Sequence, residues 1–191
     1  MADTTLNVAV ICGSLRKGSF NAELARTLPG LAPAGLSLTP APPWAQFPVY
    51  NHDDQMATGI PAAVSTWADA IRAADGVIIV SPEYNWGIPG GLKNAIDWAS
   101  RLKEVPFAGK PVAMQSAAPG LLGGARMQAQ LRMVLTSVDA LMFGKPEVFV
   151  NLAAKKFDDK TLALTDQPTI DMVKAQLAAF EKFVRRMTGK V

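Results

Sequence analysis

The most constraining feature of this chain is the alternation of short apolar runs with longer segments of helical periodicity. The clearest run, residues 77–80, has four consecutive apolar residues and is rich in β-branched side chains. Such a run is typical of a strand that is buried on both faces. Because runs of this kind alternate with helices through short connections, we expect right-handed crossovers and a parallel sheet covered by helices on both sides.

The periodicity, together with glycine and proline breaks, places five strands and five main helices along the chain. Five strands in this rhythm fit a flavodoxin-like α/β fold, a three-layer sandwich with a parallel sheet of order 2-1-3-4-5. The length favours a single domain over residues 1–191. The proline-rich stretch 40–54 is expected to be a loop. The expected strands are 6–12, 36–39, 77–80, 112–115 and one within 142–150, and the expected helices are 21–28, stopped by Pro29 and Gly30, then 61–73, 89–102, 123–136 and 168–187.

Charge and composition limit the classes of partner. The formal net charge is +3, yet lysine and arginine are scattered, with no basic run interleaved with aromatic residues. This pattern favours anionic small molecules over nucleic acid. A hydrophobic content of 49% favours some apolar surface hidden in a homo-oligomer.

Compartment and metal content are indicated by a few residues. Cys12 is the sole cysteine, which excludes an intramolecular disulfide and fits a reducing compartment. The N-terminal stretch lacks a basic region followed by an apolar one, and no apolar run approaches 18 residues. His52 is the sole histidine, so a metal centre with several histidines lacks its ligands. We expect a cytoplasmic protein with no membrane partner and no metal.

Ligands of such sheets bind beyond the carboxyl ends of the strands, where the strand order reverses. The first loop at this edge follows Cys12 and leads into a helix, whose free N–H groups and dipole favour an anion. Ser14, Ser19 and Asn21 add neutral donors, and Arg16 adds a fixed charge. The lysine of a P-loop and the second glycine of a dinucleotide fingerprint are absent, which leaves a metal-free monophosphate as ligand. An ordinary capped turn is the alternative.

The two other loops at this edge have unusual compositions. Residues 81–91 include Tyr84 and Trp86, which can form an aromatic wall for a planar heterocycle, or can simply pack on neighbouring side chains. Residues 116–124 contain three glycines after position 119, which allow close backbone approach to a ligand or make a flexible connector. The sequence therefore predicts a ligand cleft formed by three loops.

Together the loops resemble the NADPH-dependent FMN reductase family, which includes quinone, azo-dye and chromate reductases. The resemblance spans residues 6 to about 150. It is carried by Gly13-Ser14-Leu15-Arg16, Ser19 and Asn21, by Pro82-Glu83-Tyr84-Asn85, Gly87, Pro89-Gly90 and residues 92–98, by residues 123–126, and by Pro48, Tyr50, Asn51 and Asp53.

The resemblance implies an FMN cofactor and NADH or NADPH as electron donor. Hydride would pass from nicotinamide to flavin N5, and two electrons would then pass to a quinone, chromate, azo or similar small acceptor. The flavin would carry the chemistry, so no catalytic residue of the protein is expected. The phosphate would lie on Ser14, Arg16, Ser19 and Asn21, the ring along Pro82, Glu83, Tyr84, Asn85 and Gly87, and Ser116 and Gly120 near its far edge.

The family commonly forms homodimers or homotetramers, and the resemblance implies the same here. The alternative function is a non-catalytic flavodoxin-like electron carrier or an FMN-binding regulatory module. Carriers are usually acidic, whereas this chain is basic, so the enzyme is the favoured interpretation.

Overall fold

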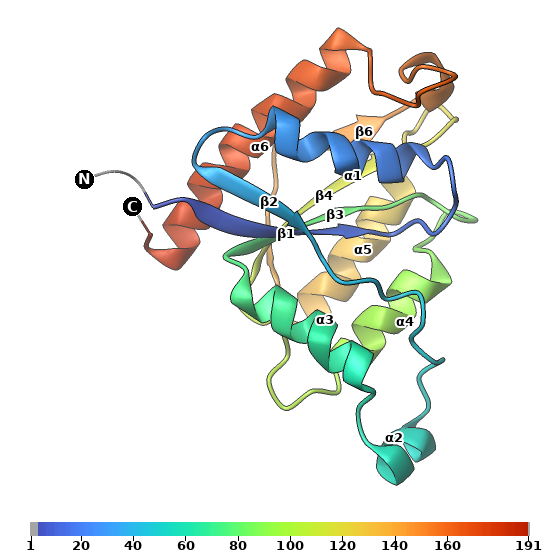
Figure 1. Ribbon diagram of the computed structural model, residues 1–191, viewed down its shortest axis with the longest axis vertical. Helices are drawn as coiled ribbons and strands as arrows, with labels where there is room; N and C mark the ends of the chain where they lie inside the picture. Colours follow the sequence, from blue (N-terminus) through green and yellow to red (C-terminus); the bar gives the residue numbers. More distant parts are fainter. Residues whose placement is uncertain (1–3, 191) are drawn as a thin grey trace.

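The structure, a computed structural model, describes residues 4–190 (Figure 1). Residues 1–3, on which the expectation about the N-terminal stretch partly rests, and residue 191 lie outside the described range. A parallel sheet runs in the order β2-β1-β3-β4-β5, and a further short strand, β6, pairs with β4. The expected flavodoxin-like order is confirmed. The strands are β1 Leu6–Cys12, β2 Leu36–Pro40, β3 Gly76–Val80, β4 Pro111–Ala117, β5 Leu141–Met142 and β6 Val148–Val150.

Helices cover both faces of the sheet. Helices α1 and α6 pack on one face, and α3, α4 and α5 pack on the other (Figure 1). None of the helices within residues 4–190 is long and apolar enough to cross a membrane. The helices are α1 Phe20–Leu31, α2 His52–Thr58, α3 Ala62–Ala73, α4 Gly90–Ala99, α5 Ala125–Ser137 and α6 Gln167–Thr188, with a 3₁₀ turn at Ala153–Lys155.

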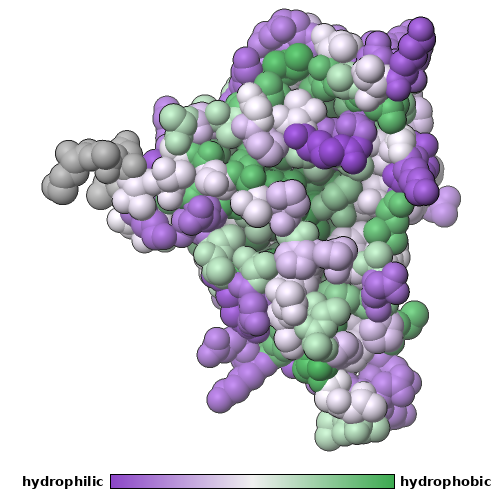
Figure 2. Space-filling view, in the orientation of Figure 1, coloured by the Kyte–Doolittle hydropathy of each residue, from purple (hydrophilic) through white to green (hydrophobic). Residues whose placement is uncertain are grey.

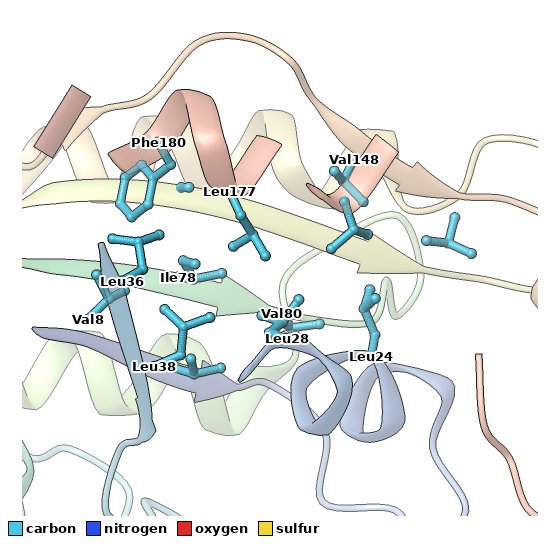
Figure 3. Packing of buried hydrophobic residues seen from close by; sticks show 14 of the residues in the cluster. Val8, Leu24, Leu28, Leu36, Leu38, Ile78, Val80, Val148, Leu177 and Phe180 are labelled. Atoms are coloured by element: carbon cyan, nitrogen blue, oxygen red, sulfur yellow. The ribbon is translucent and has the colours of Figure 1, made fainter. Parts of the chain in front are cut away.

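The sheet separates two apolar cores, because successive side chains of a strand point to opposite faces. In β3, Ile78 and Val80 join the core under α1 and α6, whereas Val77 and Ile79 join the core under α3, α4 and α5. Figure 3 shows the first core, where Phe180 and Leu177 of α6 pack over the strands. Burial on both faces explains why the central strands read as continuous apolar runs.

Three local expectations need correction. Helix α1 continues past Pro29 to Leu31: Pro29 gives up one hydrogen bond within the helix, and the packing of Leu31 against the core favours the last turn. The expected loop over 40–54 ends earlier, because the Asn51 side chain caps the short helix α2. The expected fifth strand is divided into β5 and β6, separated by a stretch containing Pro146, which has no N–H to donate to the ladder.

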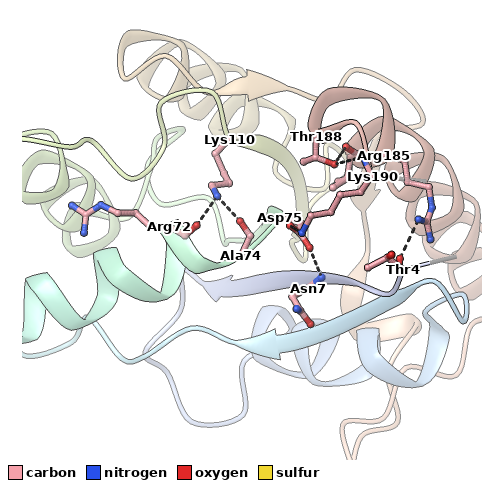
Figure 4. Close-up of polar contacts among 10 residues, drawn as sticks. Thr4, Asn7, Arg72, Ala74, Asp75, Lys110, Arg185, Thr188 and Lys190 are labelled. Carbon is pink, nitrogen blue, oxygen red and sulfur yellow. Dashed lines mark hydrogen bonds and ion pairs between the residues drawn. The ribbon is translucent and has the colours of Figure 1, made fainter.

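At the amino ends of the strands, polar contacts tie the chain together (Figure 4). The Asp75 carboxylate accepts from the N–H of Asn7 at 2.9 Å and pairs with the Lys190 ammonium beyond the end of α6. Lys110 donates to the carbonyl oxygens of Arg72, at 3.0 Å, and of Ala74. These contacts fasten α6 and the ends of β1, β3 and β4 to one another at this edge.

Candidate functional site

A cleft of about 320 Å³ lies at the carboxyl ends of β1, β3 and β4. Its position matches the point where the strand order reverses, as expected for this fold. Its volume is in the range of small-molecule sites. The lining residues are Ser14, Arg16, Ser19, Phe20 and Asn21 from the β1–α1 loop, Pro82, Glu83 and Tyr84 from the β3–α4 loop, and Ala117, Ala118 and Pro119 from the end of β4.

The β1–α1 loop presents an anion site. Ser19 caps α1: its Oγ accepts from Ala22 N–H at 3.4 Å, and its carbonyl accepts from Glu23 N–H at 3.0 Å. Within the described chain, the N–H groups of Phe20 and Asn21 have no acceptor. The exposed Arg16 lies in the same loop. Free N–H groups at a helix N-terminus beside a guanidinium suit a phosphate.

The side chain of Asn21 hydrogen-bonds to the backbone at the end of β4. It is buried, and it donates to the carbonyl oxygen of Ala117 at 2.8 Å while accepting from the N–H of Ala117 at 2.9 Å. These two bonds join the start of α1 to the end of β4. One N–H of the side-chain amide and its oxygen are therefore engaged by the protein, and the second N–H of that amide and the backbone N–H of Asn21 remain for a ligand.

The β3–α4 loop turns sharply over two residues. Tyr84 and Gly87 exchange N–H to carbonyl bonds of 3.0 and 2.9 Å, and Asn85 and Trp86 between them have φ of 49° and 66°. Positive φ at both central residues is the geometry of a tight hairpin turn. The turn leaves Tyr84 49% exposed and Trp86 64% exposed, so both aromatic side chains face solvent.

The same loop is fastened to the start of α5. The N-cap residue of α5 is Gly124, which has no side chain, and the Glu83 carboxylate instead accepts from Met127 N–H at 3.0 Å. The Arg126 guanidinium lies 4.3 Å from the centre of the Trp86 ring, within the range of a cation–π contact. Gln130 donates to the carbonyl oxygen of Trp86 at 3.1 Å. Glu83 is therefore a helix-capping carboxylate as well as a wall of the cleft.

Near the end of β4, Ser116 faces the protein interior. Its buried hydroxyl donates to the carbonyl oxygen of Gly123 at 2.6 Å and accepts from Gln128 at 2.7 Å. Gly124 has φ of 93°, and a Cβ there would lie 2.6 Å from the Cβ of Ser116, so only glycine fits.

Of the residues expected at the site, the cleft brings together those of the first loop with three of the second. They are Ser14, Arg16, Ser19 and Asn21, and Pro82, Glu83 and Tyr84. The cleft does not include Asn85, Gly87, Ser116 or Gly120 in its lining. The sequence interpretation missed Phe20 and residues 117–119. These residues could have been predicted from the sequence, because they lie directly beside Ser19, Asn21 and Ser116 along the chain.

Cys12 and His52 do not add a reactive group to the cleft. Burial raises the pKa of the Cys12 thiol, which donates to the carbonyl oxygen of Ser14 at 3.5 Å, so it stays protonated. His52 is exposed at the start of α2. Among the described residues, no group of three or more His, Cys, Asp or Glu side chains is arranged to hold a metal ion.

Comparisons with known proteins agree with this geometry. Residues 6–155 match the NADPH-dependent FMN reductase family. A quinone reductase of Escherichia coli (strain K12) is 49% identical over 182 residues, which cover 95% of this chain and 97% of that protein. An NAD(P)H-dependent FMN reductase of Pseudomonas aeruginosa is 42% identical over 96% of this chain and 98% of its own. The solved structure of FerB, a flavoenzyme NAD(P)H:(acceptor) oxidoreductase from Paracoccus denitrificans, has a TM-score of 0.85 and 33% identity, covering 96% of this chain and 99% of that one.

Proposed function

Because this chain belongs to the NADPH-dependent FMN reductase family, we propose that it holds FMN in the cleft and uses NADH or NADPH to reduce quinones. The observation that carries the proposal is the capped N-terminus of α1, whose free N–H groups lie beside Arg16 in the cleft. When bound, FMN supplies the ring that takes hydride from the nicotinamide and passes two electrons to the acceptor. Reductase relatives that match over nearly the whole chain favour an enzyme over an electron carrier.

The phosphate would be held chiefly by backbone and hydroxyl groups. The N–H groups of Phe20 and Asn21 are available, as is the hydroxyl of Ser14. The Ser19 Oγ accepts from Ala22, yet its own hydrogen is free to be donated. Arg16 adds charge that is exposed to solvent, so its contribution falls as salt rises. These residues fit a phosphate ester without a metal ion.

The ring would lie between two walls of the cleft. Pro82, Glu83 and Tyr84 form one wall, and Ala118 and Pro119 come from the other side. The turn at Asn85 to Gly87, although outside the lining, adjoins the first wall and is proposed to border the ring edge. The exposed Tyr84 and Trp86 leave an apolar platform at the mouth, where nicotinamide and quinone rings can pack in turn.

Exposed apolar side chains support a homodimer or homotetramer. Trp86, Leu121 and Met133 are 64%, 74% and 68% exposed, and a second subunit would bury such side chains. Figure 2 shows further apolar residues in the hollow along β1 and β2, where a groove is lined by Val8 and Ala9. Sedimentation velocity of the FMN-loaded protein tests the oligomeric state.

Chromate and azo compounds are proposed as further electron acceptors, and the cytoplasm is proposed as the compartment.

The decisive experiment reconstitutes the purified protein with FMN and adds NADPH or NADH without oxygen. Bleaching of the flavin absorbance, followed by its return on addition of a quinone, is the expected result. A protein that binds FMN but is not bleached would be a carrier, and one that binds no FMN would refute the proposal. Arg16→Ala should weaken FMN binding at low salt, whereas the matched variant Lys17→Ala, at an exposed neighbouring position, should not.

A further inference from the structure

A hairpin between β6 and α6 approaches the phosphate-binding loop from outside the cleft. Phe157 and Leu164 form an antiparallel bridge at its base, and both side chains are buried. The tip is ordered locally, because the Asp158 carboxylate accepts from the N–H groups of Lys160 and Thr161 at 3.0 and 2.7 Å. The hairpin, residues 157–164, is therefore anchored at its base by two buried side chains and has a hydrogen-bonded turn at its tip.

Two side chains of the hairpin contact the β1–α1 loop. A Cβ placed on Gly18 would lie 3.4 Å from Cδ1 of Leu162, so this leucine lies against the backbone of Gly18. The centres of the Phe157 and Phe20 rings are 5.1 Å apart. Phe20 is the first residue of α1 and lines the cleft. In Figure 1 this orange segment curls beside the blue N-terminal end of α1.

The backbone at Leu162 is strained in a way that its packing explains. Its φ is +58°, in the left-handed region, which costs a residue other than glycine about 1 kcal/mol. Leu162 N–H donates to the carbonyl of Asp158 at 2.8 Å, a bond that glycine would make equally well. The leucine side chain lies beside Gly18, a contact that glycine at this position would lack.

The β1–α1 loop needs such outside support. In the part of the chain that the structure describes, the hydrogen bonds at Ser14 to Gly18 are long: Arg16 N–H to Ser14 Oγ at 3.4 Å and the Cys12 thiol to Ser14 O at 3.5 Å. Gly18 itself has a φ of +68°. A loop with so few bonds of its own keeps its shape through packing.

We propose that the hairpin positions the phosphate-binding loop, with Leu162 pressed on Gly18 as the positioning residue for the cofactor phosphate. Leu162 does not touch the cofactor; it holds the loop whose N–H groups and hydroxyls do. The inference rests on the proposed FMN site and adds a determinant of phosphate affinity from a segment more than 140 residues away in sequence.

The test compares binding of FMN and of riboflavin, which lacks the phosphate, to the cofactor-free protein by quenching of flavin fluorescence. Leu162→Gly removes the contact and relieves the left-handed strain, so the free energy of unfolding should change little, whereas the less fixed loop should raise the Kd for FMN about tenfold, or about 1.4 kcal/mol. The Kd for riboflavin should not change. Lys160→Ala, an exposed position in the same hairpin, is the matched control and should bind both as wild type does.

The outcomes separate the two proposals. Wild-type affinity of Leu162→Gly for FMN, or equal weakening of FMN and riboflavin, would overturn the positioning role while leaving the FMN site in place. A wild-type protein that binds neither flavin would overturn both. Leu162→Asn, which also tolerates the left-handed conformation, gives the same comparison in case the glycine variant unfolds.

Discussion

Replacing Asn21 with alanine should destabilise the fold and the cleft together. The amide of Asn21 makes both of its hydrogen bonds to the peptide groups of Ala117, across the gap between α1 and β4. Asn21→Ala leaves that N–H and that carbonyl without their partner. Helix α1 then loses its only direct polar link to the end of β4 among the described contacts.

The magnitude follows from the burial of the two groups. A buried peptide group left unpaired costs about 1–3 kcal/mol. Ala117 also lines the cleft, so water can reach part of it, and the combined loss is expected at about 2–4 kcal/mol. For a chain of this size the melting temperature should fall by roughly 5–15 °C.

Urea denaturation of the cofactor-free protein, followed by circular dichroism, measures this loss. Thr27→Ala is the matched control on the same helix, because its hydroxyl bonds only to the carbonyl of Glu23, at 2.9 Å. A loss below about 1 kcal/mol for Asn21→Ala would refute the clamp, since it would mean that water replaces both bonds. Unchanged stability with abolished FMN binding would instead make the Asn21 side chain a phosphate ligand.

Three further perturbations have defined outcomes. Glu83→Ala should lower the free energy of unfolding by about 0.5–2 kcal/mol in urea denaturation, because the α5 N-terminus loses its cap, and a smaller loss in Glu83→Gln would show the share due to charge. Gly13→Ala should cost about 1–3 kcal/mol in thermal unfolding, because its Cβ would lie 2.4 Å from the Ser81 hydroxyl; an unchanged melting temperature contradicts this. Partial burial raises the pKa of Asp75, yet hydrogen bonds, chiefly from Lys190, outweigh it and lower the pKa below its usual value. The stability difference between wild type and Asp75→Asn should therefore be present at neutral pH and disappear as acid protonates the carboxylate below about pH 4, and a difference that persists in acid would exclude this cause.

Local sequence patterns predicted the fold where burial is continuous along the chain. Residues 77–80 read as a strand buried on both faces, and β3 has that environment. The pattern failed where a distant contact decides the local structure. Pro29 signals a helix end, but the packing of Leu31 on the core carries α1 further. Likewise β5 pairs with the start of β4 and β6 pairs with its end. The break between them depends on this pairing with a distant strand, which the local sequence does not contain.

At the site, the sequence predicted which loops meet but could not assign each side chain its partner. Ser14, Arg16 and Tyr84 line the cleft as expected. Asn21 and Ser116 have the residue types of ligand donors, yet their partners are protein groups: Ala117, 96 residues along the chain, and Gln128. A polar residue in a ligand-binding loop is equally suited to bind the ligand or to hold the loop, and only the three-dimensional contacts distinguish the two roles.

The holding contacts determine where cofactor affinity comes from. Asn21 fixes the first loop to β4, Glu83 fixes the second to α5, and Ser116 fixes the third through the carbonyl of Gly123. Loops that are ordered before binding lose little further conformational entropy when a ligand arrives, so each N–H to phosphate bond contributes more of its free energy to affinity. Substitutions at the holding residues should therefore change stability and FMN affinity together. Arg16→Ala, at an exposed position, should change affinity while the melting temperature of the cofactor-free protein stays constant, and a parallel loss of both would place Arg16 among the holding residues.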